Sequence, residues 1–286
     1  MRRGGREGAG RAAARAGAAA LALLAAGGAV SGPAAAAPAP RPAIAAHRGG
    51  ALLWPENSLT AFRGALALGV DLVEMDVHQT RDGEVVVLHD ATLERTTTGR
   101  GPVAALAWPE LLGVTLRGTA SERLPRLADV LALVGPTRAG VLLEIKTGPH
   151  GAPYPDIEAR TLALLAAAGL EARTTVMAFE WATLERFRAR SPGLRLTGLV
   201  SRYDAVRLGG LAAAAERLRG LGANDLGIEW TLLGPEAIAA ARGAGLTIGV
   251  WTVNQPDELR RALASDVDYV TTDRPDLALE FRAARR

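Results

Sequence analysis

The stretch Asp71–Val77, with the sequence DLVEMDV, places two carboxylates inside an otherwise apolar run. Its length and its β-branched residues are typical of a buried strand. Side chains two residues apart on a strand point to the same face, so Glu74 and Asp76 are expected side by side. Carboxylates on an apolar strand are too costly to bury without a partner or a cation. The stretch therefore predicts a buried strand and a polar site together.

Seven other stretches have the same strand-like character. They are Ala43–His47, Val141–Lys146, Thr174–Phe179, Arg195–Val200, Leu226–Trp230, Thr247–Val253 and Asp268–Thr272. Helical patterns lie between and after the strands, at Ser58–Leu68, Leu127–Val134, Asp156–Ala168, Trp181–Arg190, Ala205–Leu218, Pro235–Arg242, Asp257–Ala264 and Asp276–Ala284. Asn57 is a candidate N-cap of the first helix. Strand–helix alternation favours a parallel sheet, and eight units predict an α/β fold of the TIM (β/α)8 barrel type.

A small insertion interrupts this rhythm between strand 2 and strand 3, over about residues 78–125. Asp82-Gly83 is a strong hairpin signal, and Glu84–His89 follows it as an extra strand. A long excursion at the C-terminal end of a barrel strand usually builds part of the active site. His89 lies on this insertion and is therefore a candidate site residue.

The first 36 residues have the layout of a secretory signal peptide. Five arginines precede an Ala/Leu-rich stretch, and Ala34-Ala35-Ala36 offers a small-residue cleavage site. An uncleaved anchor is the alternative. We expect a signal peptide at residues 1–36, a linker at 37–42 and one domain at 43–286. The mature protein is then secreted, with no stable membrane insertion after the leader is removed.

Charge and composition narrow the classes of partner. The chain has 33 basic and 30 acidic residues, but the leader holds five arginines and one acid. The remaining 28 basic and 29 acidic residues give a net charge of −1, so the basic character belongs to the leader. This near-neutral balance, with few aromatic residues, disfavours a nucleic-acid partner. The chain has no cysteine, which excludes thiolate nucleophiles and thiolate metal sites.

Charged side chains gather where the predicted strands end, which is where barrel enzymes place their active sites. Glu74, Asp76 and Glu144 offer three oxygen ligands, which suit one divalent cation, Ca²⁺ or Mg²⁺, better than zinc. The alternative is a rim of salt bridges in which Arg48 and Lys146 pair with these carboxylates. The sequence leaves both interpretations open.

Two of the four histidines are candidates for proton transfer. His47 follows the first strand and His89 lies on the insertion, and hydrolysis needs one acid and one base near neutral pH. His78 and His150 are expected to be solvated. Trp251 either fills the core or lines a substrate pocket.

These polar fragments resemble, in order and spacing, the glycerophosphodiester phosphodiesterases, over essentially all of residues 43–280. The fragments that carry the resemblance are His47-Arg48-Gly49, Glu56-Asn57-Ser58, Glu74-Met75-Asp76-Val77, Thr80-Arg81-Asp82-Gly83, Val87-Leu88-His89-Asp90, Leu93-Glu94-Arg95-Thr96-Thr97, Leu143-Glu144-Ile145-Lys146, Trp251-Thr252-Val253-Asn254 and Thr272-Asp273-Arg274-Pro275. Each fragment is weak alone, whereas the ordered set is specific.

The resemblance implies a barrel that hydrolyses glycerophosphodiesters to sn-glycerol 3-phosphate and an alcohol such as choline or ethanolamine. It implies that a divalent cation is held by Glu74, Asp76 and Glu144. It also implies that His47 and His89 are the acid–base pair, and that Arg48 and Lys146 hold the phosphate. Which histidine is the acid stays open, as does attack by water or through a cyclic phosphate. The alternatives are a related barrel phosphodiesterase acting on lysophospholipid or phosphoinositide headgroups, and a catalytically silent binding protein.

Overall fold

The structure, a computed structural model, describes residues 42–285. The predicted signal peptide and all but the last residue of the predicted linker lie outside the described residues. Both therefore stay predictions.

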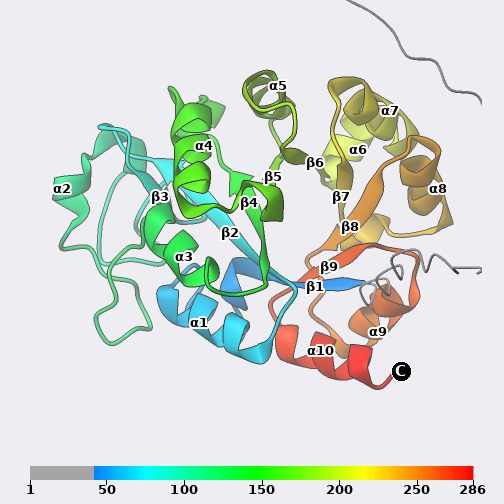
Figure 1. The fold of residues 1–286 in the computed structure, drawn as a ribbon, viewed down its shortest axis with the longest axis horizontal. Helices are drawn as coiled ribbons and strands as arrows, with labels where there is room; N and C mark the ends of the chain where they lie inside the picture. Colours follow the sequence, from blue (N-terminus) through cyan, green and yellow to red (C-terminus); the bar gives the residue numbers. More distant parts are fainter. Residues whose placement is uncertain (1–41, 286) are drawn as a thin grey trace, which may run out of the picture. The chain divides into compact units, whose positions relative to one another are not determined.

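Eight parallel strands form a closed barrel, as the sequence predicts (Figure 1). The barrel strands are β1 (Ala43–Ala46), β2 (Leu72–Gln79), β4 (Gly140–Ile145), β5 (Thr174–Ala178), β6 (Arg195–Val200), β7 (Asp225–Glu229), β8 (Thr247–Trp251) and β9 (Tyr269–Thr272). Their order is β1-β9-β8-β7-β6-β5-β4-β2, and pairing of β1 with β2 closes the ring. This closure is the geometry of the TIM barrel.

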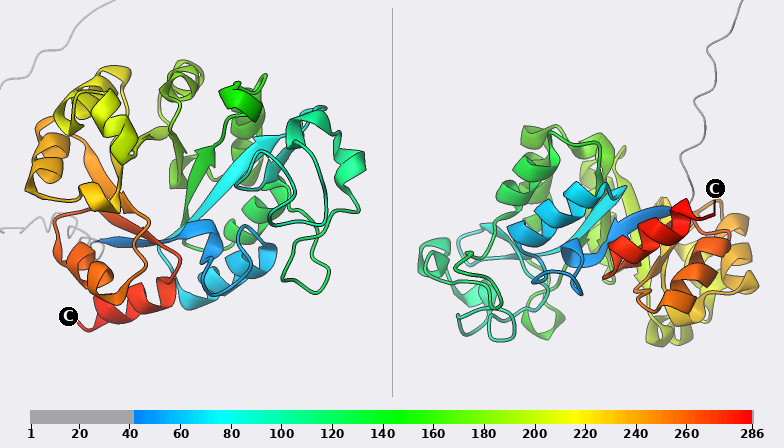
Figure 2. Two further views of the ribbon diagram at one scale, coloured as in Figure 1. Left: turned by 180° about the vertical axis from the view of Figure 1, so that it is seen from behind. Right: turned by 90° about the horizontal axis from the view of Figure 1, so that it is seen from below.

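Helices surround the barrel on its outside (Figures 1 and 2). They are α1 (Leu59–Leu68), α3 (Leu127–Val134), α4 (Ile157–Ala168), α5 (Trp181–Arg190), α6 (Arg202–Arg207), α7 (Leu211–Leu221), α8 (Pro235–Gly243), α9 (Pro256–Ala264) and α10 (Pro275–Ala283), whereas the short α2 (Trp108–Leu111) lies on the insertion. Short 3-10 turns occur at η1 (His47–Gly49), η2 (Val103–Ala105), η3 (Pro149–Gly151), η4 (Glu171–Arg173) and η5 (Trp230–Leu232). Within residues 42–285, no helix combines the length and the apolar character that crossing a membrane requires.

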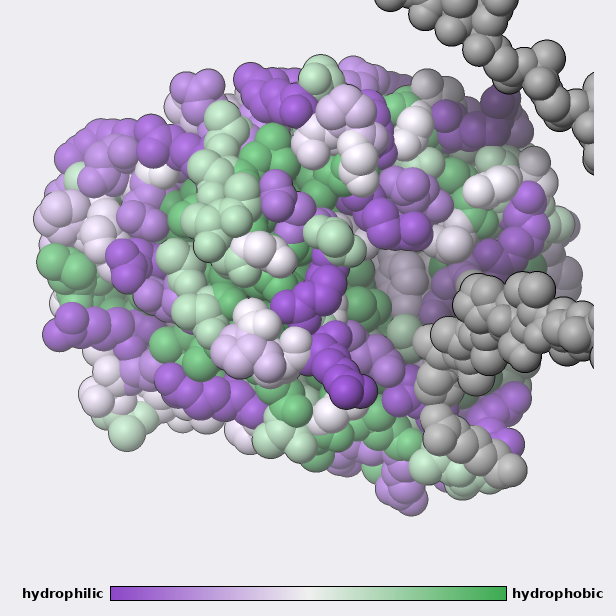
Figure 3. All heavy atoms as spheres, in the orientation of Figure 1, coloured by the Kyte–Doolittle hydropathy of each residue, from purple (hydrophilic) through white to green (hydrophobic). Residues whose placement is uncertain are grey.

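The main core lies between the barrel wall and these helices. On β2, Val73, Met75 and Val77 point outward into this core and are fully buried. Because side chains alternate along a strand, Glu74 and Asp76 share the opposite face, inside the barrel. On the surface shown in Figure 3, hydrophobic and hydrophilic residues are intermixed, with pale hydrophobic residues over α4.

The insertion begins as a hairpin of β2 with β3 (Val85–Val87), in cyan beside the barrel in Figure 1. β2 runs two residues past its predicted end at Val77, because its last residues pair antiparallel with β3. β3 is correspondingly shorter than predicted. The insertion has a small core of its own, which comprises Val86, Leu88, Leu93, Val103, Leu111, Leu116 and Leu124.

Two local predictions are wrong. The helix expected over Ala205–Leu218 is two helices, α6 and α7, because Gly209 and Gly210 between them have φ of +82° and +103°. A left-handed backbone ends a helix. The N-cap of α1 is Ser58, which accepts from the backbone N–H of Ala61, and not Asn57. Asn57 instead has a φ of +56° and donates its side-chain amide to Asp76.

Candidate active site

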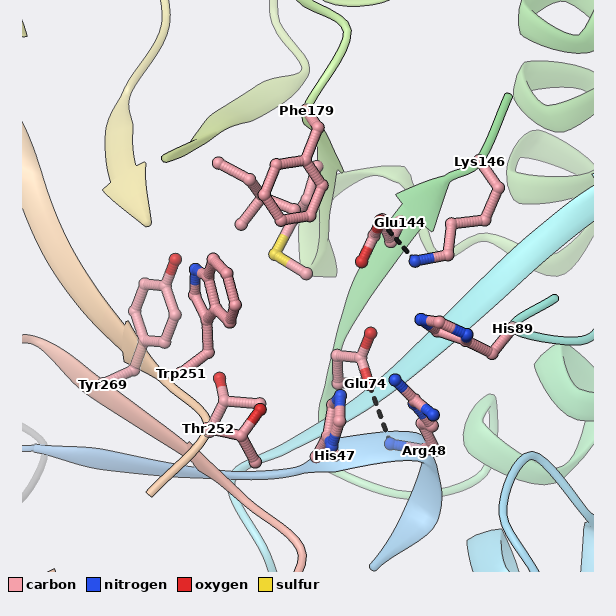
Figure 4. A pocket seen from close by; sticks show the side chains of 13 residues that line it. His47, Arg48, Glu74, His89, Glu144, Lys146, Phe179, Trp251, Thr252 and Tyr269 are labelled. Atoms are coloured by element: carbon pink, nitrogen blue, oxygen red, sulfur yellow. Dashed lines mark hydrogen bonds and ion pairs between the residues drawn. The ribbon is translucent and has the colours of Figure 1, made fainter. Parts of the chain in front are cut away.

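The predicted site residues converge at one mouth of the barrel (Figure 4). η1 follows β1 and carries His47 and Arg48, while Glu144 and Lys146 lie at the end of β4. Seven of the eight predicted residues line a cavity of about 170 Å³, and the eighth, Asp76, is fully buried on the barrel face of β2. The structure therefore brings all eight predicted residues together at one mouth of the barrel.

Three buried carboxylates form a compact group within this site. Glu74, Asp76 and Glu144 each offer an oxygen, and these oxygens all lie within 4.8 Å of one another. Asp76 and Glu144 lie close together because they are paired residues on the adjacent strands β2 and β4. The Oδ1 atom of Asp76 is buried and makes no hydrogen bond, although Lys146 Nζ lies 3.1 Å from it. The donor set, three carboxylates and no thiolate, fits a hard divalent cation.

The three carboxylates differ in how strongly their charged forms are stabilised. Burial, with the neighbouring Asp76 and Glu144 charges and against the pull of His47, raises the pKa of Glu74 to about 8. Burial also raises the pKa of Glu144, despite Lys146. The pKa of Asp76 lies well below its usual range, because Lys146 and Arg48 outweigh its burial. Arg48 and Lys146 thus stabilise the charged form of Asp76, whereas burial and the neighbouring carboxylates disfavour the charged form of Glu74, and a bound cation would offset that penalty.

Arg48 and Lys146 make the ion pairs that the sequence offered as an alternative to a cation site. Lys146 Nζ lies 2.7 Å from Glu144 Oε1, and Arg48 Nε lies 3.4 Å from Asp76 Oδ2. The backbone N–H of Arg48 donates to Glu74 Oε2 at 2.7 Å. The Arg48 and Lys146 side chains pair with Asp76 and Glu144 and not with Glu74, so these ion pairs and a cation cage are compatible.

His47 is held by residues that follow the last two barrel strands. Its Nδ1 lies 2.7 Å from Asp273 Oδ1, and Asp273 Oδ2 accepts from the amide of Asn254 at 2.6 Å. Burial lowers the pKa of His47, but Glu74 and then Asp273 outweigh it, so its pKa is raised overall. Asp273 belongs to one of the fragments that carry the family resemblance, and its position directly after β9 was the signal in the sequence for a site residue.

His89 is held by a chain of ion pairs that begins on the insertion. Its Nδ1 lies 2.8 Å from Asp90 Oδ1, and Arg95 Nε lies 2.6 Å from Asp90 Oδ2. Arg95 also donates twice to Glu56 at 2.8 Å, and Glu56 accepts from Arg48 at 3.1 Å. Burial, aided by Lys146 and Arg48 and opposed by Asp76, lowers the pKa of His89. This chain connects His89 to Arg48 across the mouth, and sequence reasoning missed it.

The prediction that His78 is solvated is wrong, whereas His150 is exposed as predicted. His78 is buried because the hairpin with β3 covers the end of β2. Its Nε2 lies 3.0 Å from the backbone oxygen of His89 and its Nδ1 lies 2.7 Å from the hydroxyl of Tyr154. Burial lowers the pKa of His78 to about 4, so the neutral ring anchors the backbone beside His89.

An apolar wall faces the charged residues across the cavity. Trp251, Phe179 and Tyr269 lie on one side in Figure 4, opposite Lys146 and His89. The rings of Phe179 and Trp251 meet edge to face, with centroids 5.3 Å apart. Trp251 therefore lines the pocket rather than only filling the core. The whole arrangement suits acid–base chemistry on an anionic group that carries a small organic arm.

Comparisons with known proteins agree with this geometry. The sequence model of the family described as the glycerophosphoryl diester phosphodiesterase family matches residues 47–277. A glycerophosphodiester phosphodiesterase of Caldanaerobacter subterraneus subsp. tengcongensis is 31% identical over 243 residues, covering 83% of this chain and 96% of that protein.

Solved structures show the same architecture. A protein of Agrobacterium tumefaciens assigned to the glycerophosphoryl diester phosphodiesterases superposes with a TM-score of 0.81 at 30% identity, over 86% of this chain and 98% of its own. An Oleispira antarctica phosphodiesterase in complex with sn-glycerol-3-phosphate has a TM-score of 0.72 at 24% identity, over 84% of this chain and 96% of its own. The latter likeness concerns the fold.

Proposed function

This chain belongs to the glycerophosphoryl diester phosphodiesterase family, and we propose that its barrel mouth holds the scissile phosphate between one divalent cation and two histidines. The chain is a phosphoric diester hydrolase, and its metal-dependent reaction converts a glycerophosphodiester to sn-glycerol 3-phosphate and an alcohol. The observation that carries the proposal is the buried group of three carboxylates in a pocket lined by both histidines.

Glu74, Asp76 and Glu144 would hold the cation, which we propose to be Ca²⁺ or Mg²⁺. When bound, it supplies positive charge next to the phosphoryl oxygens. Rigid strands carry all three carboxylates, so the cage is preorganised by the register of β2 and β4.

Arg48 and Lys146 are proposed to hold the phosphate. Both side chains lie within 3.4 Å of the carboxylate group, so an anion next to the cage also lies next to them. Their charges stabilise the negative charge that builds on the phosphoryl oxygens as the bond to the leaving alcohol breaks.

His47 and His89 are proposed to transfer the protons. Each ring directs Nδ1 to a carboxylate, Asp273 and Asp90 respectively, which leaves Nε2 of each ring for the substrate. One Nε2 accepts the proton of the attacking hydroxyl and the other donates a proton to the departing alcohol oxygen. The attacking hydroxyl is that of water or of the substrate glycerol, which would pass through a cyclic phosphate.

Metal removal tests this proposal. Dialysis against a chelator should abolish release of glycerol 3-phosphate from glycerophosphocholine, and added Ca²⁺ or Mg²⁺ should restore it. As a readout apart from activity, the restoring cation should raise the Tm of the wild type but not of Glu144→Gln, because a ligand stabilises only the state that binds it. Glu185→Gln, an exposed change on α5, is the control. Full activity after chelation, with no cation-dependent Tm, would show that the carboxylates are structural.

We also propose that the protein is exported. The basic and then Ala/Leu-rich residues 1–36 support a cleaved signal peptide. Expressed at full length in a bacterial host, the protein should appear outside the cytoplasm with a new N-terminus between about residues 35 and 40. Mass spectrometry of the exported protein checks this, and an intact Met1 on cytoplasmic protein would contradict it.

A further inference from the structure

A second cavity of about 310 Å³ adjoins the first at the barrel mouth. The two cavities share four lining residues, which are His89, Glu144, Lys146 and Phe179. Three of these belong to the proposed acid–base, cation and phosphate groups. The phosphate of a diester would therefore sit where the cavities meet, with one cavity for each of its two organic arms.

The first cavity suits a small neutral arm with hydroxyl groups. Its free wall is apolar and aromatic, and the only carboxylates that line it, Glu74 and Glu144, belong to the cage. The indole Nε1 of Trp251 is buried without a hydrogen-bond partner among the described residues, and the hydroxyl-bearing Thr252 and Thr271 also line the cavity. A buried donor without a partner is costly, and an arm that accepts from it removes that cost.

The second cavity has a different charge. Glu180, the N-cap residue of α5, lines it and is exposed. Its carboxylate accepts from the backbone N–H of Ala182 at 3.2 Å, and no basic side chain within residues 42–285 pairs with it. Next to it, Phe179 is 37% exposed. The nearby Lys146 is already engaged by Glu144 and Asp76.

We propose that the second cavity binds the alcohol half of the diester, and that Glu180 and Phe179 select cationic amino alcohols, such as choline and ethanolamine, over neutral or anionic alcohols. This inference rests on the proposed function. An ammonium group is attracted both by an unpaired carboxylate and by an aromatic ring. The glycerol arm then occupies the first cavity, beside Trp251.

Headgroup selectivity tests the inference. Glycerol 3-phosphate release is measured for glycerophosphocholine, glycerophosphoethanolamine, glycerophosphoglycerol and glycerophosphoinositol with the holoenzyme. The wild type should have a higher kcat/KM for the two cationic diesters. Glu180→Gln should lower kcat/KM for these two by about three- to tenfold and leave the neutral diesters unchanged, because one exposed charge contributes an attraction of this order. The glutamine retains the N-cap acceptor.

Two further variants complete the design. Glu185→Gln removes the same charge from α5 outside the cavity and should leave the preference intact. Phe179→Leu should reduce the preference for choline through loss of the ring. Free choline should inhibit glycerophosphoglycerol hydrolysis by the wild type more strongly than by Glu180→Gln.

Equal kcat/KM for cationic and neutral diesters in the wild type would overturn the inference. So would a Glu180→Gln variant that prefers cationic over neutral diesters as strongly as the wild type does. Release of glycerol 3-phosphate would still support the proposed function in both cases. If no diester is cleaved, the proposed function fails and the inference fails with it.

Discussion

The two histidines of the site are supported by different parts of the molecule. His47 receives its carboxylate from Asp273, directly after β9, and Asn254 fixes that carboxylate. The barrel register places these residues. His89 lies on the insertion and depends on Asp90 and Arg95 for its position. The side chain of Arg95 is 46% exposed, whereas that of Asp273 is 15% exposed.

This difference in support and exposure predicts which conditions and substitutions should disturb each histidine. Hydrogen bonds among partly buried groups at fixed strand ends are weakly screened by salt. Partly exposed ion pairs are screened, and each contributes little. We therefore expect the His47 side to depend on the barrel and to resist salt, and the His89 side to depend on the attachment of the insertion.

The largest effect should come from removing either ring. His47→Ala and His89→Ala should each lower kcat by about 10²- to 10⁴-fold, because each ring is proposed to transfer a proton in the reaction. Steady-state release of glycerol 3-phosphate measures this, and Glu185→Gln, an exposed change that lies outside both cavities, is the control. Near-wild-type turnover in His89→Ala would show that the insertion contributes no proton-transfer group, and the two histidines could then no longer be compared as catalytic residues.

The next effect concerns the support of His47. Asp273→Asn should lower kcat by roughly 10- to 100-fold, as loss of an orienting partner does elsewhere. Asp273 helps to raise the pKa of His47, so that pKa should fall in the variant. The limb of the pH–rate profile that reports His47 should then move to lower pH. If kcat falls while the profile and the His47 NMR titration stay unchanged, Asp273 has only a structural role.

A smaller effect should come from the support of His89. Arg95→Ala should lower kcat by about three- to tenfold at low salt, because two partly exposed ion pairs are lost. The wild type and the variant should converge as salt rises, since screening weakens the same pairs. Arg81→Ala removes another exposed ion pair of the insertion, with Glu110, and should have no such effect. A loss that is independent of salt would contradict this account.

The last comparison concerns the effect of packing on stability in the two regions. A Cβ at Gly249, on β8, would overlap the ring of Tyr269, whereas a Cβ at Gly113, on the insertion, would meet no atom of residues 42–285 within 4 Å. Gly249→Ala should therefore lower the free energy of unfolding by about 1–3 kcal/mol. Gly113→Ala should leave it nearly unchanged. Urea unfolding of both variants measures this, and equal stability would show that the barrel interior relaxes as easily as the insertion surface.

Much of the fold could be predicted because it rests on local patterns. The eight barrel strands are buried runs bounded by turn residues, and their observed ranges agree with the predicted ones to within a few residues. The errors had two sources. The positive φ angles of Gly209 and Gly210 divide one predicted helix into two, and pairing between strands changes the end of β2. β2 extends to Gln79, and His78 is buried, because β3 pairs with them.

The candidate site was also only partly predictable. Its residues could be found in the sequence because carboxylates, histidines and basic residues interrupt apolar strands. The hydrogen-bond and ion-pair partners that hold these residues in place could not. Glu56 and Arg95 are 39 residues apart, and His47 and Asp273 are 226 residues apart, so no local pattern couples them.

The sequence by itself therefore determined the barrel, the family and the identity of the residues at the mouth. It could do so because hydrophobic periodicity and the cost of burying charge act over a few residues. The tertiary structure alone decided that Asp273 supports His47, that His78 is buried, and that a second cavity with Glu180 adjoins the first. These features depend on closure of the sheet and on where the insertion packs, which bring together side chains from distant parts of the chain.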